Sequence, residues 1–323
     1  MLVLGIESTA HTFGVAVLKG KKFLCNLRDM YTTKSGGIIL EDAAKHHRNV
    51  CESLYEKALK KAKIKEKDID LITYSNAPGL APCLIAGRDF AKKLALNLKI
   101  PLVPVNHCIA HLEIGDLSGA KDPVLLYCSG ANTQIIAYAS GKYRIFGETL
   151  DVGIGNFIDS FARYAGLGFP GGPKIEKLAK SGKFVKLPYT VKGMDVAFSG
   201  LLTNLKQKYD KKYKIEDLAY SLQEHAFAML IEVAERAMAH LNKKELLLGG
   251  GVACNVRLQK MAKIMCKERK AKCFIPAKEF LVDNGGMIAY LGKKMFKSGI
   301  EVNPKKADIN DSERTDQVNV KWK

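Results

Sequence analysis

The sequence lacks the features that mark several large protein classes. Its eight cysteines include no CxxC pair, so a zinc-ribbon or dithiol motif is absent. No segment approaches the ~20 apolar residues of a membrane-spanning helix. The N-terminus, Met1-Leu2-Val3-Leu4-Gly5, carries no basic leader followed by a long apolar stretch. These absences predict a protein of the reducing cytoplasm, without membrane association, whose cysteines are free thiols.

Acidic residues are also scarce relative to basic ones. Asp and Glu number 33 against 51 Lys and Arg, which gives a formal net charge of +18. Such an excess favours a polyanionic partner, either nucleic acid or an acidic protein. Each basic cluster taken alone also fits a solvated helix face. The clusters lie within 57–67, 206–214 and 260–272.

Two stretches of the chain repeat one design. Residues 2–18 read as a strand, a small polar turn and a returning strand, and residues 123–142 repeat this pattern. At an offset of 121 (129 − 8), eight of the nineteen positions from 3 to 21 carry identical residues. The alternative is two unrelated hairpins that share turn-forming residues. A duplicated hairpin with hydroxyl and glycine residues in its turn is the nucleotide grip of the actin, hexokinase and sugar-kinase (ASKHA) superfamily, because such turns let backbone N–H groups approach phosphate.

Apolar runs alternate with helical patterns around these hairpins. The expected elements are helices over 40–63 and 86–98 and strands over 69–75 and 102–105. This alternation is typical of an α/β protein. We therefore predict a two-lobed α/β fold of the ASKHA type with a duplicated β-hairpin nucleotide site. The first lobe is expected over 1–121 and the second over 122–323.

Glycine-rich stretches in the second half predict backbone contacts to a ligand. Leu246–Leu248 is typical of a buried strand that enters Gly249-Gly250-Gly251, and a helix is expected over 252–267. A glycine turn before a helix presents free N–H groups and the positive end of the helix dipole, which favours phosphate. Tight strand-to-helix packing is the alternative. Asn255, expected on the first turn of that helix, is a candidate for a ribose or phosphate contact.

Two further glycine stretches stand beside acidic residues. Gly153 and Gly155 precede Asp159, and Gly168–Pro173 precedes a short helix that contains Glu176. Ordinary turns are the alternative. The pairing of glycine with acid indicates a ligand that carries hydroxyl or amino groups.

His107 and His111 indicate a metal site. Their four-residue spacing puts both imidazoles on one helix face, within reach of one ion; a purely structural pair is the alternative. His46 and His47 are adjacent and point to different sides of a helix, so we interpret them as surface or packing residues. Cys108 faces away from the His pair and is expected in the core.

A His pair on a helix also raises the possibility of a zinc peptidase. That reaction needs a general base beside the metal, and the HExxH motif supplies Glu directly after its first His. Cys108 occupies that position here. The missing base argues against peptidase activity.

Motifs in one order along nearly the whole chain resemble the universal tRNA threonylcarbamoyladenosine transferases, formerly described as sialoglycoprotein endopeptidases. The motifs are Gly5–Thr12, Asn106–His111, Tyr127–Thr133, Gly168–Pro173, Gly250–Asn255 and Asp283–Gly285. The ending, Arg314–Val318 with Trp322, is similar to the archaeal and eukaryotic branch, whose members work inside the KEOPS complex. The resemblance implies tRNA and other KEOPS subunits as partners, including a small atypical kinase on a separate chain.

The resemblance also implies a site between the lobes. One divalent metal ion is expected there, with iron favoured over zinc. The residues that match the family's metal ligands are His107, His111, Tyr127 and Asp283. An N-cap of a helix over 286–297 is the alternative for Asp283. The residues matching substrate and adenine-nucleotide contacts are Tyr127, Cys128, Ser129, Gly130, Ala131, Asp159, Gly172, Glu176 and Asn255. Glu7 is the candidate for assisting proton removal.

Members of this family pass a threonylcarbamoyl group from threonylcarbamoyl-AMP to N6 of the adenosine 3′ to the anticodon, and AMP leaves. Turn amides are expected to hold the phosphate of this donor, or of ATP or AMP. Ala131 and Ala77 stand where the family often has glycine, which bears on ligand fit. The rival readings are a small-molecule kinase of the same superfamily, for which a His pair is a poor Mg²⁺ site, and a non-enzymatic, nucleotide-gated scaffold.

Overall fold

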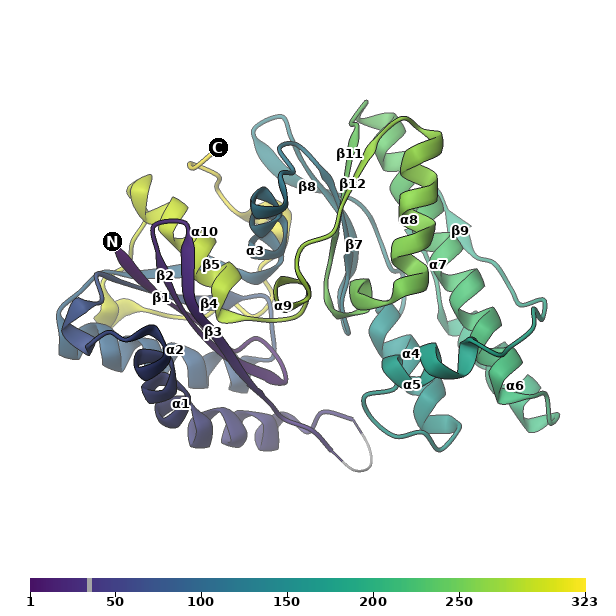
Figure 1. Ribbon diagram of the computed structural model, residues 1–323, viewed down its shortest axis with the longest axis horizontal. Coiled ribbons are helices and arrows are strands. Elements are labelled where there is room, and N and C mark those ends of the chain that lie inside the picture. Colours follow the sequence, from purple (N-terminus) through teal and green to yellow (C-terminus); the bar gives the residue numbers. More distant parts are fainter. Residues whose placement is uncertain (34–36) are drawn as a thin grey trace.

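The computed structural model describes residues 1–33 and 37–323, and two five-stranded sheets organise it (Figure 1). The first sheet contains β1 (Leu2–Glu7), β2 (Thr12–Lys19), β3 (Lys22–Met30), β4 (Leu71–Ala77) and β5 (Leu102–Asn106). The second contains β6 (Val124–Cys128), β7 (Thr133–Ala139), β8 (Lys142–Glu148), β11 (Glu245–Gly249) and β12 (Lys272–Phe274). A separate two-stranded pair is formed by β9 (Val191–Lys192) and β10 (Asp195–Val196).

The second sheet repeats the topology of the first. Its order, β8-β7-β6-β11-β12, matches β3-β2-β1-β4-β5 strand for strand. In the first sheet β1 pairs antiparallel with β2 and parallel with β4. In the second sheet β6 pairs antiparallel with β7 and parallel with β11. The sequence repeat therefore corresponds to a structural repeat, and the turns after β1 and β6 occupy equivalent places. The predicted two-lobed α/β fold with a duplicated hairpin is confirmed.

Ten α-helices surround the sheets in the described ranges. They are α1 (Leu40–Ala62), α2 (Ala81–Leu98), α3 (His107–Glu113), α4 (Ile154–Tyr164), α5 (Gly172–Ala179), α6 (Ser199–Asp210), α7 (Ile215–His240), α8 (Val256–Glu268), α9 (Lys278–Leu281) and α10 (Gly285–Lys297). Short 3₁₀ turns are η1 (Glu66–Asp68), η2 (Ile114–Ser118), η3 (Gly251–Cys254), η4 (Pro304–Lys306) and η5 (Thr315–Gln317). In the part of the chain that these ranges cover, no helix is both long and apolar enough to cross a membrane.

The pattern of buried residues explains how the helices pack on the two sheets. Buried positions along α1 recur every three or four residues, so one face of this helix packs on β2 and β3. The opposite face of the first sheet packs on α10, which contacts β1, β2 and β4. One face of the second sheet packs against the five helices from α4 through α8, and together they form the largest apolar cluster of the described residues.

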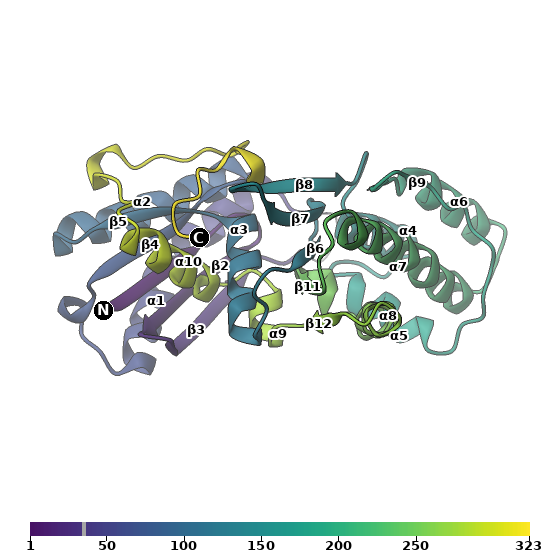
Figure 2. The same ribbon diagram turned by 90° about the horizontal axis from the view of Figure 1, so that it is seen from above.

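A further apolar cluster joins the two sheets. Val3 and Val105 of the first sheet meet Leu125 and Leu247 of the second around α3 and α10. Figure 2 shows α3 between the two halves of the molecule. The region between the sheets is therefore a packed core that contains the helix of the predicted metal ligands.

Some elements differ from the sequence expectations. The helix expected over 86–98 begins earlier, at Ala81. The helix expected over 252–267 begins at Val256, because residues 251–254 form a 3₁₀ turn and Asn255 has extended backbone. Asn255 is thus the N-cap and does not lie in the first turn. The lobe boundary at residue 122 remains a prediction, and α10 packs on the first sheet although it follows the second in sequence.

Candidate metal centre and adjoining loops

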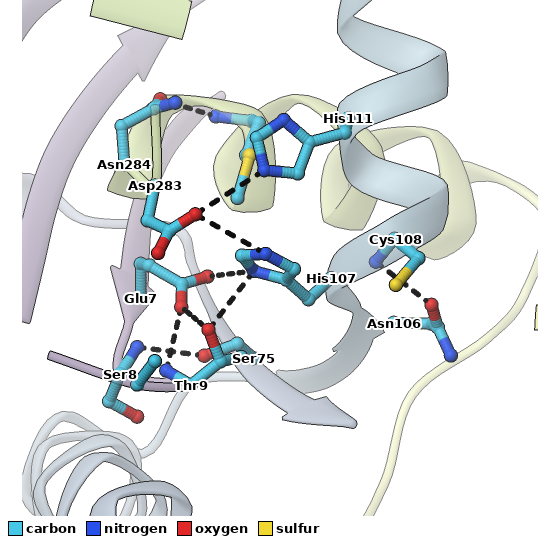
Figure 3. A network of polar contacts seen from close by, with 12 residues as sticks. Glu7, Ser8, Thr9, Ser75, Asn106, His107, Cys108, His111, Asp283 and Asn284 are labelled. Carbon is cyan, nitrogen blue, oxygen red and sulfur yellow. Dashed lines mark hydrogen bonds and ion pairs between the residues drawn. The ribbon is translucent and has the colours of Figure 1, made fainter. Parts of the chain in front are cut away.

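The short helix α3 fixes the two candidate histidines. It starts directly after β5, and the side chain of Asn106 caps it by accepting hydrogen bonds from the N–H groups of Cys108 (3.1 Å) and Ile109 (3.3 Å). His107 and His111 then lie one turn apart with ring centroids 4.8 Å from each other. Both are buried, and Cys108 lies in the core as predicted. Figure 3 shows both rings turned toward the loop before α10.

Asp283 approaches this pair from that loop. Its Oδ1 lies 3.4 Å from Nε2 of His107 and 3.5 Å from Nε2 of His111 (Figure 3). The N-cap of α10 is its neighbour Asn284, whose side chain accepts from the N–H of Met287 at 3.0 Å. The alternative interpretation of Asp283 as the cap is therefore wrong, since the carboxylate faces the imidazoles.

Glycines hold the Asp283 loop against the first sheet. A Cβ on Gly285 would lie 2.5 Å from the carbonyl oxygen of Gly5, and a Cβ on Gly14 would lie 2.8 Å from the nitrogen of Gly285. The backbone of α10 thus touches the backbone of β1 and β2 with no space for a side chain. This contact places Asp283 beside His111, although the two residues are 172 positions apart in sequence (283 − 111).

Tyr127 completes the group from the second sheet. Its hydroxyl lies 3.0 Å from Nε2 of His107, and its ring centroid lies 5.0 Å from that of His111. The four predicted metal ligands therefore lie together, although they come from three separate segments. One ligand atom from each of His107, His111 and Asp283 lies within 4.8 Å of the other two.

The surroundings of these groups fit a cation. Neither ring nitrogen of buried His111 has a hydrogen-bond partner among the described residues, and an unpaired buried polar atom is costly. Burial lowers the pKa of His111. Burial opposes ionisation of Asp283 as well, but the two imidazoles outweigh it and hold its pKa well below the usual range. A neutral imidazole beside an ionised carboxylate is the form in which both ligate a metal.

His107 differs from His111 because it faces two carboxylates. Burial lowers its pKa, but Glu7 and Asp283 outweigh burial and raise it. Glu7 is fully buried; its Oε2 lies 2.9 Å from Nδ1 of His107, and its Oε1 accepts from the N–H of Thr9 at 2.7 Å. A carboxylate on one ring nitrogen fixes the tautomer and aims the other nitrogen at the ligand site. The role of Glu7 in proton removal stays a prediction.

The remaining predicted residues lie on loops of the second lobe that contact one another. In the turn after β6, the carbonyls of Ser129 and Gly130 accept from Gly155 N at 3.0 Å and Asn156 N at 2.9 Å. A Cβ on Gly250 would lie 2.3 Å from the carbonyl oxygen of Cys128, so the 249–251 turn adjoins the same place. Cys128 is fully buried.

Polar side chains link the other two loops to this region. Asp159 accepts from Gly171 N at 2.7 Å, and burial raises the pKa of this carboxyl. Glu176 accepts from Val256 N at 2.9 Å, beside Asn255. The Asn255 side chain caps α8 and donates to Gln223 at 2.6 Å.

Three glycines in these loops have no structural need to be glycine. At Gly130 the nearest atom to an added Cβ is 3.5 Å away, and at Gly172 and Gly251 no described atom lies within 4 Å. None of the three has the positive φ that favours glycine. Gly250, by contrast, has φ +87° and no space for a Cβ. The open glycines leave backbone exposed in the manner of a ligand-binding loop.

A family model of the tRNA N6-adenosine threonylcarbamoyltransferase matches residues 24–290. The chain belongs to this family. A transferase of that name from Thermococcus sibiricus is 54% identical to this chain over 324 residues, and one from Thermococcus kodakarensis is 52% identical over 324 residues. Each alignment covers the whole of this chain and the whole of the relative. A probable bifunctional tRNA threonylcarbamoyladenosine biosynthesis protein from Thermoplasma volcanium is 49% identical, and this transferase spans 62% of its length.

Solved structures with low sequence identity share the fold of the transferase. HypF of T. kodakarensis superposes with a TM-score of 0.66 at 17% identity over 92% of this chain and 48% of HypF. An activator of 2-hydroxyisocaproyl-CoA dehydratase from Clostridium difficile gives 0.57 at 11% identity over 93% of this chain and 97% of the activator. The predicted activity, transfer of a threonylcarbamoyl group to N6 of a tRNA adenosine, is confirmed by the family.

Several residues of the site were not predicted from the sequence. Thr9, which supports Glu7, lies in the Gly5–Thr12 motif but had no predicted role. Gln223, which accepts a hydrogen bond from Asn255, lies in none of the motifs. The capping role of Asn284 could have been found, since Asn is as common an N-cap as Asp. His46 and His47 are surface and packing residues as predicted: buried His47 bonds the carbonyl of Ala10 at 2.9 Å, and half-buried His46 pairs with Asp29. Their Nδ1 atoms lie 3.5 Å apart, so the prediction that the two side chains point to different sides of the helix is wrong.

Proposed function

We propose that this transferase uses threonylcarbamoyl-AMP as its donor and the adenosine 3′ to the tRNA anticodon as its acceptor, at a centre that holds one divalent metal ion. The convergence of His107, His111 and Asp283 carries this proposal. Tyr127 is the fourth ligand. Two imidazoles, a phenolate and a carboxylate make a mixed set of nitrogen and oxygen ligands that suits either iron or zinc, and iron is the metal we propose.

We place the adenine nucleotide on the loops of the second lobe. The turn 128–131, the open backbone at Gly172, and the side chains of Asp159, Glu176 and Asn255 are its contacts. The open glycines support this placement, because phosphate binding to backbone N–H groups requires close approach. Cys128 is fully buried, whereas Ser129 is half-buried and Gly130 is exposed, so this turn is open to a ligand from Ser129 onward.

The reaction joins N6 of the adenosine to the carbamoyl carbon and breaks the bond from that carbon to the phosphate oxygen of AMP. AMP leaves with the electron pair, and N6 loses a proton. When bound, the metal supplies Lewis acidity that anchors and polarises the threonylcarbamoyl group. Glu7 is the proposed proton acceptor, and its contact with Nδ1 of His107 adds a second task, which is to orient that imidazole.

We propose that tRNA binds through the basic surface implied by the net charge of +18. Other KEOPS subunits, including a small kinase on a separate chain, are the proposed protein partners. The cytoplasm is the proposed location, where all eight cysteines persist as the free thiols found here.

Incubation with threonylcarbamoyl-AMP and unmodified tRNA, followed by digestion and mass spectrometry of the nucleosides, tests the reaction. We expect threonylcarbamoyladenosine at one position, with partner subunits present. A parallel incubation with ATP and common sugars tests the kinase alternative. Phosphorylated sugar without modified nucleoside would contradict the proposal.

Nucleotide binding is tested by calorimetry with ATP and AMP. Gly130→Val and Glu176→Ala should each weaken binding at least ~10-fold, because a side chain at 130 obstructs phosphate approach without a clash inside the protein. Gly200→Val, at another open glycine, is the matched control. Unchanged affinity in both site variants would mean that the nucleotide lies elsewhere.

A further inference from the structure

The C-terminal segment that follows α10 returns to α3, the helix that contains His107 and His111. Residues 298–323 leave α10, cross the first lobe and end beside α3 (Figure 2). Along this path Tyr74 donates to the carbonyl of Asp308 at 2.8 Å, and Arg88 pairs with the Asp308 carboxylate at 3.0 Å. The segment is thus fixed to the first sheet and α2 before it reaches α3. Its last eleven residues lie well beyond the end of the family match at 290.

The segment contacts the N-terminal end of α3 through Glu313. The Asn106 side chain uses its oxygen to cap α3, and its amide nitrogen donates to Oε2 of Glu313 at 3.1 Å. Because one side chain makes both contacts, Glu313 fixes the orientation in which Asn106 caps the helix. The next residue along α3 is the ligand His107. Thr315, two residues after Glu313, is buried.

The segment contacts the C-terminal end of α3 through Lys323. Glu113, the last residue of α3, is fully buried. Its carboxylate pairs with Nζ of Lys323 at 3.1 Å and with Lys294 of α10, and it accepts from the hydroxyl of Tyr143. A buried carboxylate requires such partners.

The same segment also joins the two lobes. Arg314 pairs with Glu148 of β8 at 3.0 Å, and the ring of Trp322 lies 6.4 Å from that of Tyr143, also on β8. Val318 and Val320 pack on the apolar cluster shared by the sheets. The segment therefore spans the face on which α3, α10 and β8 meet.

We propose that Glu313 and Lys323 are positioning residues that hold both ends of α3, and so set the distance of His107 and His111 from Asp283 and Tyr127. The seven-residue helix carries two of the four proposed ligands, so a tilt at either end moves an imidazole away from the other groups. This inference rests on the proposed metal centre. It assigns a task in metal binding to residues that touch no ligand.

Metal affinity of the full-length protein, measured by titration of the metal-free form with Co²⁺, tests the proposal. Glu313→Ala should bind Co²⁺ about tenfold more weakly, the low end of the effect of supporting residues at metal sites. Glu313→Gln should restore the affinity, because its amide oxygen still accepts from Asn106. Lys323→Met should also weaken binding, whereas Lys321→Met, at an exposed position of the same segment, is the matched control.

The visible absorption of bound Co²⁺ gives a second readout, because its intensity reports the coordination geometry. We expect an altered spectrum for Glu313→Ala and Lys323→Met and the wild-type spectrum for Glu313→Gln. Wild-type affinity and spectrum in both disruptive variants would overturn the inference alone. Wild-type affinity in His111→Ala would instead show that the metal centre itself is misplaced, so the two failures are distinguishable.

Discussion

At the scale of single residues, neighbouring side chains divide tasks that either could perform. Asp283 and Asn284 both precede α10, and either residue type can cap a helix. Asn284 makes the cap, whereas the Asp283 carboxylate meets two imidazoles. An amide is a weaker metal ligand than a carboxylate, so the order of the two residues places the stronger ligand at the proposed metal centre.

This division predicts opposite outcomes for the two residues. Asp283→Ala should lose the bound metal and threonylcarbamoyl transfer, with little loss of stability beyond the contribution of the metal. Asn284→Ala should keep both but lower the free energy of unfolding by about 1 kcal/mol, the usual value of an N-cap. Elemental analysis and urea unfolding of the two purified variants measure these quantities. Full metal content in Asp283→Ala would refute the assignment.

His47 predicts a pH dependence of stability. Burial, together with His46, His11 and Arg48, lowers its pKa from 6.5 to about 4, although its bond to the carbonyl of Ala10 opposes the shift. The unfolded chain therefore binds a proton at a pH where the folded protein does not. Stability is full above about 6.5 and falls as the pH decreases toward 4.

The loss through His47 should reach about 2 kcal/mol at pH 5, from the two pKa values by linkage. Urea unfolding at pH 7.5 and pH 5 measures it against His47→Gln, in which the side chain can still donate to Ala10 but does not titrate. The variant should lose less stability than the wild type between the two pH values. Equal losses would show that His47 is protonated in both states.

At the scale of elements, the contact of α10 with β1 holds Asp283 beside the two histidines of the proposed metal centre. Gly5 and Gly285 allow the two backbones to touch, and a Cβ on Gly5 would lie 2.1 Å from the carbonyl oxygen of Gly285. The contact involves backbone atoms, so no side-chain rotation relieves it. Any side chain there moves the start of α10 and, with it, the preceding loop that contains Asp283.

We therefore expect Gly5→Ala to destabilise the protein by about 3 kcal/mol or more, as for overpacked cores, and to weaken metal binding in the fraction that folds. Gly200→Ala is the matched control, since its position in α6 has no described atom within 4 Å, and it should stabilise by about 0.5 kcal/mol. Thermal unfolding and metal titration give both values. A wild-type melting temperature in Gly5→Ala would contradict the close contact.

At the scale of the whole molecule, two copies of one topology supply different parts of the site. The first sheet provides Glu7 and, through β5, the His helix, while the second provides Tyr127 and the ligand loops. The two turns after β1 and β6 are equivalent in fold. Only the second turn has an open glycine, Gly130, and only the first hairpin has a buried acid, Glu7 at the end of β1.

The net charge predicts how tRNA binding responds to salt. With 51 basic against 33 acidic residues, affinity should fall at least about tenfold between 50 and 200 mM salt, which corresponds to about two phosphate contacts. Binding by the isolated chain should be weak, because the lysines are spread over several helices. Filter binding across a salt series measures the slope. A salt-independent affinity, or no binding even with partner subunits, would contradict the prediction.

The family resemblance, the duplicated hairpin and the pair of His107 and His111 can all be found in the sequence alone. The hairpin and the pair depend on local signals, namely the strand and turn periods and the helical spacing. Tyr127 and Asp283 became proposed ligands only through the family resemblance. The helix of the His pair and the core position of Cys108 follow from the same local patterns.

Three features became apparent only in the folded chain: which of Asp283 and Asn284 faces the two histidines, where α8 begins, and what supports the proposed metal centre. Asp283 and Asn284 are interchangeable as local cap signals, and the packing of Gly285 on Gly5 selects between them. The 3₁₀ turn before Asn255 follows from the approach of Gly250 to Cys128. The contact of Glu313 with Asn106 joins residues 207 positions apart. The periodic pattern of apolar residues in the sequence does not predict these three contacts, because they form when backbone segments that are distant in sequence pack against each other.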